Sequence, residues 1–272
     1  MAKEVKNGLR YSLKSIKGGP QGLDTSARRI YYSRPVKGMR QAICELGFKL
    51  WDKGFVEGNA GNISLRLADN LVLATPTLRS KGFLKAEEIA LVTLEGRQLA
   101  GQLPVTSEIV MHLAVFAKTQ AIVCIHAHPV HVLAFALSGQ SPPSGILPEV
   151  EIFLGEIGLA PYRTPGSQDL AETIGELAPR HQCIIMANHG VVVWGKGLED
   201  AYWKIEVIDA YCHALLHQAQ LGEPLKRLSP AAMQKLFAIR RRLGMPEERD
   251  SRDESDLYIG KDFGGKSIEL LP

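Results

Sequence analysis

Two histidines separated by one residue, His126 and His128, are the most informative chemical feature of this chain. They directly follow the apolar run 121–125, which the residue pattern predicts to be a buried strand. Because alternate residues of an extended chain face the same side, both imidazoles are expected to converge at the end of that strand. A divalent metal ion could lie there, although two histidines at a strand end could also simply be solvated.

A third histidine, His189, favours the metal site. It stands between two apolar runs, 183–187 and 191–194, and the glycine that follows it suits a tight connection between two strands. Three histidines with one open coordination position form the arrangement that catalytic zinc uses. The sequence therefore predicts a metal site made by three histidines that are distant along the chain.

Glu108 is the candidate acid of this site. Thr106 or Ser107 is a plausible N-cap for a short amphipathic helix, so Glu108 is expected in its first turn. An acid there could simply complement the helix dipole, worth about 0.3–1 kcal/mol. Because the helix leads directly into the His126 strand, we expect Glu108 to lie near the metal. His112 follows one turn later and could support the site, but a lone helical histidine is more often a packed core residue.

The same part of the chain offers groups that favour a phosphate. Backbone amides, a side-chain amide, hydroxyls and a helix N-terminus all suit a phosphate's negative charge. The candidates are Gly61, Asn62, Thr77, Thr106 and Ser107. Turns of glycine and threonine are more often only turns. Arg79 and Lys81 could add positive charge, but long cations on loops are usually solvated.

Alternating strand and helix patterns indicate the elements that must position these residues. Strands are predicted at residues 61–66, 70–75, 91–94, 121–125, 183–187 and 191–194. Helices are predicted at residues 37–53, 130–137, 198–221 and 230–243, beside the one that follows Ser107.

Composition excludes several classes of protein. The chain has 272 residues, of which 45% are apolar and 22% charged, as expected for a globular protein with a sizeable core. Its net charge of +3 does not argue for nucleic acid. No apolar run reaches the roughly 18 residues of a membrane-spanning helix, and the first residues lack the apolar centre of a secretory signal. Four widely spaced cysteines without a C-x-x-C pair indicate core residues in a reducing, cytoplasmic compartment.

Six stretches together resemble the class II aldolase/adducin family, especially its fuculose-phosphate and rhamnulose-phosphate aldolases. They are Gly61 to Arg66, Ala74 to Thr77, Leu103 to Glu108, His126 to His128, Ala160 to Tyr162, and Asn188 to Gly190. The similarity covers residues 39–221. Together with the change in composition at both ends, it divides the chain into three predicted parts: a basic N-terminal arm (1–37), a catalytic domain (38–224), and a C-terminal helix and tail (225–272).

The resemblance implies a fold and an assignment of the site. The implied fold is a three-layer α/β/α sandwich with a mixed, mostly antiparallel central sheet, usually assembled as a homotetramer. The residues at His126, His128 and His189 would bind Zn2+, and Glu108 would join the metal and act as acid and base. The phosphate would be held by the residues at Gly61, Asn62, Thr77, Thr106 and Ser107.

The activity implied by the resemblance is cleavage of a ketose phosphate, such as fuculose or rhamnulose 1-phosphate, to dihydroxyacetone phosphate and an aldehyde. A decarboxylase, an epimerase or a dehydratase of sugar phosphates could act on the same metal site. A non-catalytic, adducin-like module is the alternative from another class, and it is expected to lack the metal histidines. No nucleic-acid or membrane partner is expected.

The chain departs from the aldolase pattern at two places. Leu78 stands where the aldolases have a glycine after the Thr77 position. This leucine is expected to crowd the phosphate-binding loop or to keep the phosphate away from one backbone amide. The tyrosine that the aldolases carry near residues 145–150 is absent. The group that exchanges a proton with the aldehyde oxygen is therefore unassigned, with Glu149, Glu151 and Tyr162 as candidates.

Overall fold

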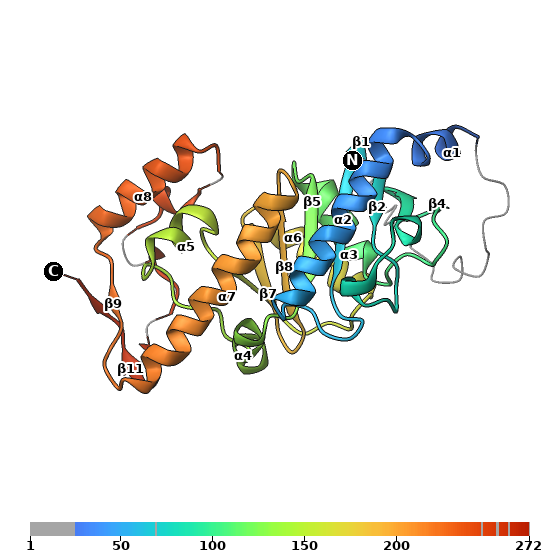
Figure 1. Cartoon of the computed structure of the whole chain (residues 1–272). Coiled ribbons are helices and arrows are strands. Elements are labelled where there is room, and N and C mark those ends of the chain that lie inside the picture. Colours follow the sequence, from blue (N-terminus) through green and yellow to red (C-terminus); the bar gives the residue numbers. More distant parts are fainter. Residues whose placement is uncertain (1–24, 69, 246, 254–255, 261, 272) are drawn as a thin grey trace, which may run out of the picture.

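One eight-stranded sheet forms the centre of the computed structural model, which describes residues 25–68, 70–245, 247–253, 256–260 and 262–271 (Figure 1). Its strand order is β4-β3-β2-β1-β5-β8-β7-β6. Neighbouring strands are antiparallel except for β6 and β7, which are parallel. The strands are β1 (Asn62–Ala68), β2 (Leu71–Ala74), β3 (Ala90–Thr93), β4 (Gln98–Ala100), β5 (Val123–Ala127), β6 (Gly158–Ala160), β7 (Cys183–Met186) and β8 (Gly190–Gly195).

Helices cover both faces of this sheet. One face carries α2 (Arg34–Asp52), α4 (Val130–Ser138) and α7 (Leu198–Gln220), and the other carries α3 (Ile109–Lys118) and α6 (Gln168–Leu177). Successive strand residues point to opposite faces, so Ile125 packs in the first core and Cys124 in the second. The two cores confirm the expected three-layer sandwich with a mixed, mostly antiparallel sheet.

The strands predicted around the histidines are all present, and so are the predicted helices. The first long helix begins at Arg34 rather than at residue 37, since Pro35 is well suited to the first turn of a helix. Part of the predicted basic N-terminal arm forms the helix α1 (Thr25–Tyr31). The Tyr31 hydroxyl donates a 2.9 Å hydrogen bond to the Ile89 carbonyl, which fixes α1 to the sheet. The rest of that arm, residues 1–24, lies outside the described residues.

The C-terminal region packs on the rest of the chain. The helix α8 (Pro230–Arg242) lies against the short helix α5 (Pro148–Phe153). The guanidinium of Arg249 lies 2.5 Å from a carboxylate oxygen of Glu151 and 2.7 Å from Glu247. The remaining short elements are η2 (Lys81–Phe83), η3 (Ala86–Glu88), η4 (Arg249–Ser251), β9 (Lys226–Arg227), β10 (Asp262–Phe263), β11 (Lys266–Ser267) and β12 (Glu269–Leu270).

Two further predictions from the sequence concern membrane-spanning helices and the cysteines. In the part of the chain that the structure describes, no helix has both the length and the apolar character needed to cross a bilayer. All four cysteines are buried and carry free thiols, which confirms Cys124 and Cys183 as small core residues.

Candidate metal centre

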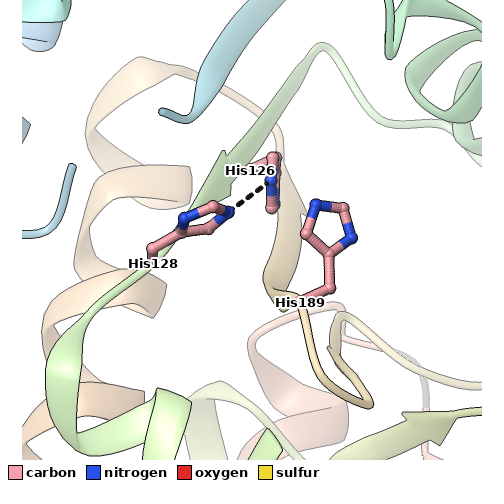
Figure 2. A group of neighbouring side chains, drawn as sticks. All are labelled: His126, His128 and His189. Atoms are coloured by element: carbon pink, nitrogen blue, oxygen red, sulfur yellow. Dashed lines mark hydrogen bonds between the residues drawn. The ribbon is translucent and has the colours of Figure 1, made fainter. Parts of the chain in front are cut away.

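The three predicted histidines converge at one end of the sheet (Figure 2). His126 is the fourth residue of β5, His128 follows that strand, and His189 lies in the turn between β7 and β8. One ligand atom from each ring lies within 4.8 Å of the others, and the Nε2 atoms of His126 and His128 are 3.0 Å apart. Residues separated by 63 positions in the sequence are therefore neighbours, because β5 pairs with β8.

Two rings of this triad, those of His126 and His189, are suited to act as neutral ligands. The Nδ1 atom of His126 lies 2.9 Å from the Val191 carbonyl, so Nδ1–H donates to this oxygen and Nε2 keeps its lone pair. Burial lowers the pKa of His126 to about 3, and burial together with the neighbouring His126 lowers the pKa of His189 to about 4. Metal binding requires deprotonated imidazole, and these rings are already in that form at neutral pH.

Glu108 completes the cluster from the other side. Its two carboxylate oxygens lie 3.4 Å from Nε2 of His126 and 3.3 Å from Nε2 of His189. The side-chain amide of Asn62, which pairs with His126 across β1 and β5, donates a 2.9 Å hydrogen bond to Glu108 Oε2. Oε1 is buried and finds no hydrogen-bond donor among the described residues. A buried anionic oxygen without a donor fits a cation, and three nitrogens with one carboxylate suit a divalent transition metal.

Glu108 reaches this position in a different way from the predicted one. It is the N-cap of α3, and neither Thr106 nor Ser107 caps the helix. The segment before α3 is held against the end of β2 instead, since the Thr106 amide donates to the Thr75 carbonyl at 3.0 Å. The Thr106 hydroxyl accepts a 3.3 Å hydrogen bond from the Glu108 amide. These contacts hold the Glu108 side chain beside the histidines.

The turn that carries His189 depends on Asn188 and Gly190 for different reasons. Asn188 adopts the left-handed φ of 56°, which asparagine tolerates better than most residues. Gly190 is therefore not the residue that makes the tight turn. A Cβ on Gly190 would lie 2.6 Å from the Ala127 carbonyl and 2.6 Å from Cδ2 of His128. The glycine is required because the histidine cluster packs directly over its Cα.

Replacement of Gly190 by alanine is therefore expected to displace His128 and to weaken metal binding. Overpacking of this kind costs about 1–3 kcal/mol of unfolding free energy. Gly197→Ala is the matched control, since a Cβ there meets nothing within 4 Å. Metal content and thermal unfolding of both variants test this prediction. Equal metal content in Gly190→Ala and wild type would contradict it.

Three of the candidate phosphate residues, Thr77, Thr106 and Ser107, lie in two adjacent segments. The Thr77 amide donates to the Pro104 carbonyl at 3.0 Å, and Pro76 forms an isolated bridge with Val105. Thr77 is thereby placed next to the segment of Thr106 and exposed Ser107. The predicted residues on these two segments are therefore brought together.

Gly61 and Asn62 lie on the strand side of the cluster. Gly61 has a left-handed φ of 71°, and a Cβ there would lie 2.9 Å from the His126 carbonyl. The side-chain Nδ2 of Asn62 donates to Glu108, so this group supports the candidate metal ligands.

The substitution at Leu78 does not crowd this loop. Leu78 keeps the left-handed conformation that glycine would adopt, with a φ of 54°, and its side chain is 77% exposed. A leucine in this conformation costs roughly 1–2 kcal/mol, which the surrounding loop contacts offset. The loop thus retains its backbone path, and the leucine points into solvent.

Lys81 is the residue that sequence reasoning misjudged. It is only 2% exposed, and its ammonium donates to the carbonyls of Asn59 at 3.0 Å and Arg79 at 2.5 Å. No carboxylate forms an ion pair with it among the described residues, whereas Arg79 pairs with Glu88 at 2.6 Å. Burial lowers the pKa of Lys81 to about 8, against a smaller opposing effect of Glu108. Nothing in the sequence distinguishes this lysine from a solvated loop cation.

The remaining candidates have structural roles or lie at the surface. His112 is buried, contacts the Ser64 hydroxyl at 2.6 Å, and has its pKa lowered to about 3 by burial, as expected for a packed core histidine. Glu151 accepts a hydrogen bond from the Gly145 amide and pairs with Arg249, so its carboxylate is already engaged. Glu149 and Tyr162 are exposed.

Comparison with known proteins agrees with this geometry. A 3-oxo-tetronate 4-phosphate decarboxylase of Haemophilus influenzae is 35% identical over 167 residues, which cover 60% of this chain and 79% of that protein. An L-fuculose phosphate aldolase of Methanococcus maripaludis is 35% identical over 182 residues, which cover 66% of this chain and 96% of that protein.

A solved structure shows the same fold. YgbL of Escherichia coli, whose description gives aldolase, epimerase and decarboxylase as alternatives, superimposes with a TM-score of 0.69 at 27% identity. The match covers 74% of this chain and 98% of that one. Residues 41–216 match the family described as Class II Aldolase and Adducin N-terminal domain. The fold, the histidine cluster and these matches agree, and the chain belongs to the class II aldolase/adducin family.

Proposed function

We propose that this protein is a metal-dependent lyase that breaks a carbon–carbon bond of a small phosphorylated sugar. The observation that carries the proposal is the convergence of three imidazoles beside Glu108, which lies close to His126 and His189 and whose buried Oε1 has no donor among the described residues. The aldolase reaction is our first candidate, with fuculose or rhamnulose 1-phosphate as the type of substrate. Its products would be dihydroxyacetone phosphate and an aldehyde.

His126, His128, His189 and Glu108 would hold the ion, for which we propose Zn2+. A bound divalent ion would act as a Lewis acid that stabilises negative charge on the sugar's carbonyl and hydroxyl oxygens. The protein fixes the ligands in advance, because Val191 orients His126 and Asn62 orients Glu108.

Glu108 is the proposed proton carrier. When the C3–C4 bond breaks, the electron pair stays on C3 of the dihydroxyacetone phosphate portion, and that carbon must gain a proton. Glu108 in its protonated form would deliver this proton, since its two oxygens lie within 3.4 Å of Nε2 of His126 and of His189. In the reverse direction the same carboxylate would remove a proton from dihydroxyacetone phosphate.

Lys81 extends the proposed phosphate site, which otherwise consists of Gly61, Asn62, Thr77, Thr106 and Ser107. Its ammonium links the loop before Gly61 to the loop after Thr77, and two of its three N–H groups are used in doing so. A buried cation without a counter-ion is unfavourable in the free protein, and an anionic substrate group would compensate it. We therefore infer that Lys81 binds the substrate's phosphate or carboxylate.

Replacement of Lys81 by methionine is expected to separate binding from stability. Loss of a charge-assisted contact, worth about 1.5–3 kcal/mol, should raise the KM for a phosphorylated substrate roughly 10- to 100-fold. Thermal stability should be unchanged or higher, because methionine removes a buried unpaired charge. Lys85→Met is the control, since Lys85 is an exposed lysine of the same segment. An unchanged KM in Lys81→Met would contradict the assignment.

The pH dependence of stability gives a second readout for Lys81. Its folded-state pKa of about 8 lies below its ordinary 10.5, so between these values the unfolded chain binds more protons than the folded one. The contribution of Lys81 to stability therefore rises as the pH increases through this window. Chemical denaturation at pH 8 and pH 10 should show this rise in wild type and a smaller rise in Lys81→Met.

Decarboxylation of a phosphorylated 3-oxo sugar acid is the second candidate. In an aldol cleavage the C4 hydroxyl must give up its proton as the aldehyde forms, whereas an ionised carboxylate releases carbon dioxide without such a proton transfer. The aldolase tyrosine is absent here, and Glu151 is engaged by Arg249. Among the described residues the site therefore has no evident group for this proton transfer, which favours a reaction that does not require it. The Haemophilus influenzae relative is named for such a reaction.

Product analysis distinguishes the two candidates. The purified, metal-loaded protein should be incubated separately with fuculose 1-phosphate, rhamnulose 1-phosphate and 3-oxo-tetronate 4-phosphate. Release of dihydroxyacetone phosphate would support the aldolase, and release of carbon dioxide would support the decarboxylase. Absence of both products, with metal bound and the fold intact, would reject the proposed function for these substrates.

A further inference from the structure

A second group of histidines lies where α4 packs against α7, outside the metal centre described above (Figure 1). His213 and His217 stand one turn apart on α7, and both side chains are exposed. Their Nε2 atoms are 2.8 Å apart, and their ring centroids are 4.6 Å apart. Two ring nitrogens at this distance cannot both carry a proton, so at least one of them presents a lone pair to the other.

This spacing resembles that of the metal centre itself. The Nε2 atoms of His126 and His128 are 3.0 Å apart, close to the 2.8 Å of His213 and His217. Two ligands of a tetrahedral ion with metal–nitrogen bonds near 2.0–2.1 Å lie about 3.3 Å apart. A small opening of the two rings would therefore admit an ion between them. Histidines at positions i and i+4 of a helix suit such chelation.

Two further side chains hold the pair in place. The ring of His213 stacks on that of His131 from α4, with centroids 3.8 Å apart and planes inclined by 13°. Nδ1 of His131 contacts both carboxylate oxygens of Asp209, at 3.0 and 3.1 Å. Asp209 lies one turn before His213 on the same face of α7. This chain of contacts restricts the His213 ring and so reduces the entropy lost when a ligand binds.

We propose that His213 and His217 form a second, surface site for a divalent transition-metal ion, with water at its remaining positions and with His131 and Asp209 as positioning residues. Two imidazole nitrogens select borderline ions such as Zn2+, Ni2+ or Cu2+, whereas Mg2+ and Ca2+ prefer oxygen ligands. Because both rings are exposed, binding requires little loss of solvation. The inference is independent of the proposed catalytic function.

Calorimetric titration of the full chain with Zn2+, after removal of metal by a chelator, tests this site. Wild type is expected to show two classes of binding, of which the weaker is lost in both His213→Ala and His217→Ala. The stronger class should be unchanged in these variants. Gln220→Ala, a change at an exposed position near the end of the same helix, is the control and should keep both classes. Asp209→Asn should weaken only the weaker class.

A reciprocal variant shows that the two classes are different sites. His126→Ala should lose the stronger class and keep the weaker one, with circular dichroism used to verify its fold. The proposal is overturned if wild type binds a single class, or if the weaker class persists in both His213→Ala and His217→Ala. Because these two side chains are exposed, the α7 variants remain decisive even if His126→Ala does not fold.

Discussion

Replacement of His128 by alanine is expected to abolish tight metal binding and to reduce turnover by roughly three orders of magnitude. Loss of even a supporting contact costs about 10- to 100-fold in metal affinity, and loss of a ligand should cost more. A metal acting as a Lewis acid contributes several kcal/mol to catalysis, and each 1.36 kcal/mol corresponds to a factor of ten in rate. His128 is the suitable ligand to remove, because its side chain is 19% exposed and its loss leaves no closed cavity.

Metal content by elemental analysis and turnover of the metal-loaded variant are the two measurements. His181→Gln is the control, since His181 contacts the Glu156 carbonyl and lies outside the cluster. Both properties should be retained in the control. Wild-type metal content and turnover in His128→Ala would exclude the triad as the metal centre.

Glu108→Gln is expected to lower kcat by about 10²- to 10⁴-fold while the histidines retain the ion. Glutamine preserves the volume of the side chain, and its carbonyl oxygen can still accept the hydrogen bond of Asn62. It cannot exchange a proton with the sugar carbon, and it contributes no negative charge to the cluster. A large fall in kcat with metal still bound would identify proton transfer as the main role of this residue.

Two comparisons make this result specific. Glu57→Gln introduces the same chemical change at an exposed carboxylate 3.6 Å from His128, and its turnover should stay close to wild type. If Glu108→Gln loses its metal as well, the carboxylate acts chiefly as a ligand. Full activity in Glu108→Gln would remove Glu108 from the proposed mechanism.

The sequence predicted those properties that depend on residues close together along the chain. Alternation along β5 predicted that His126 and His128 converge at the end of that strand, and the apolar runs around His189 predicted two buried strands. The prediction that three histidines form one cluster also agreed with the structure. Their imidazoles needed partners in any buried setting, and strands that end at the same edge of a sheet bring their terminal residues together.

Other features depend on distances that local patterns do not contain. The hydrogen bond from Asn62 to Glu108 joins residues 46 positions apart, and Asn62 was therefore expected on the phosphate side only. The burial of the Lys81 side chain depends on two loops that fold over it. The need for a glycine at position 190 comes from His128 above it, since the turn itself is made by Asn188.

The sequence alone thus determined the chemical kinds of ligand, most of the strands and helices, and the family resemblance that implied the three-layer fold, because residue types and short periodicities express the ligands and the elements directly. Tertiary structure alone decided which carboxylate oxygen lacks a donor, which lysine is buried without an anion, and that His213 and His217 face each other beside His131. Whether a side chain is buried and whether its charge is paired depend on segments that meet only after folding. No single stretch of the chain therefore specifies either property.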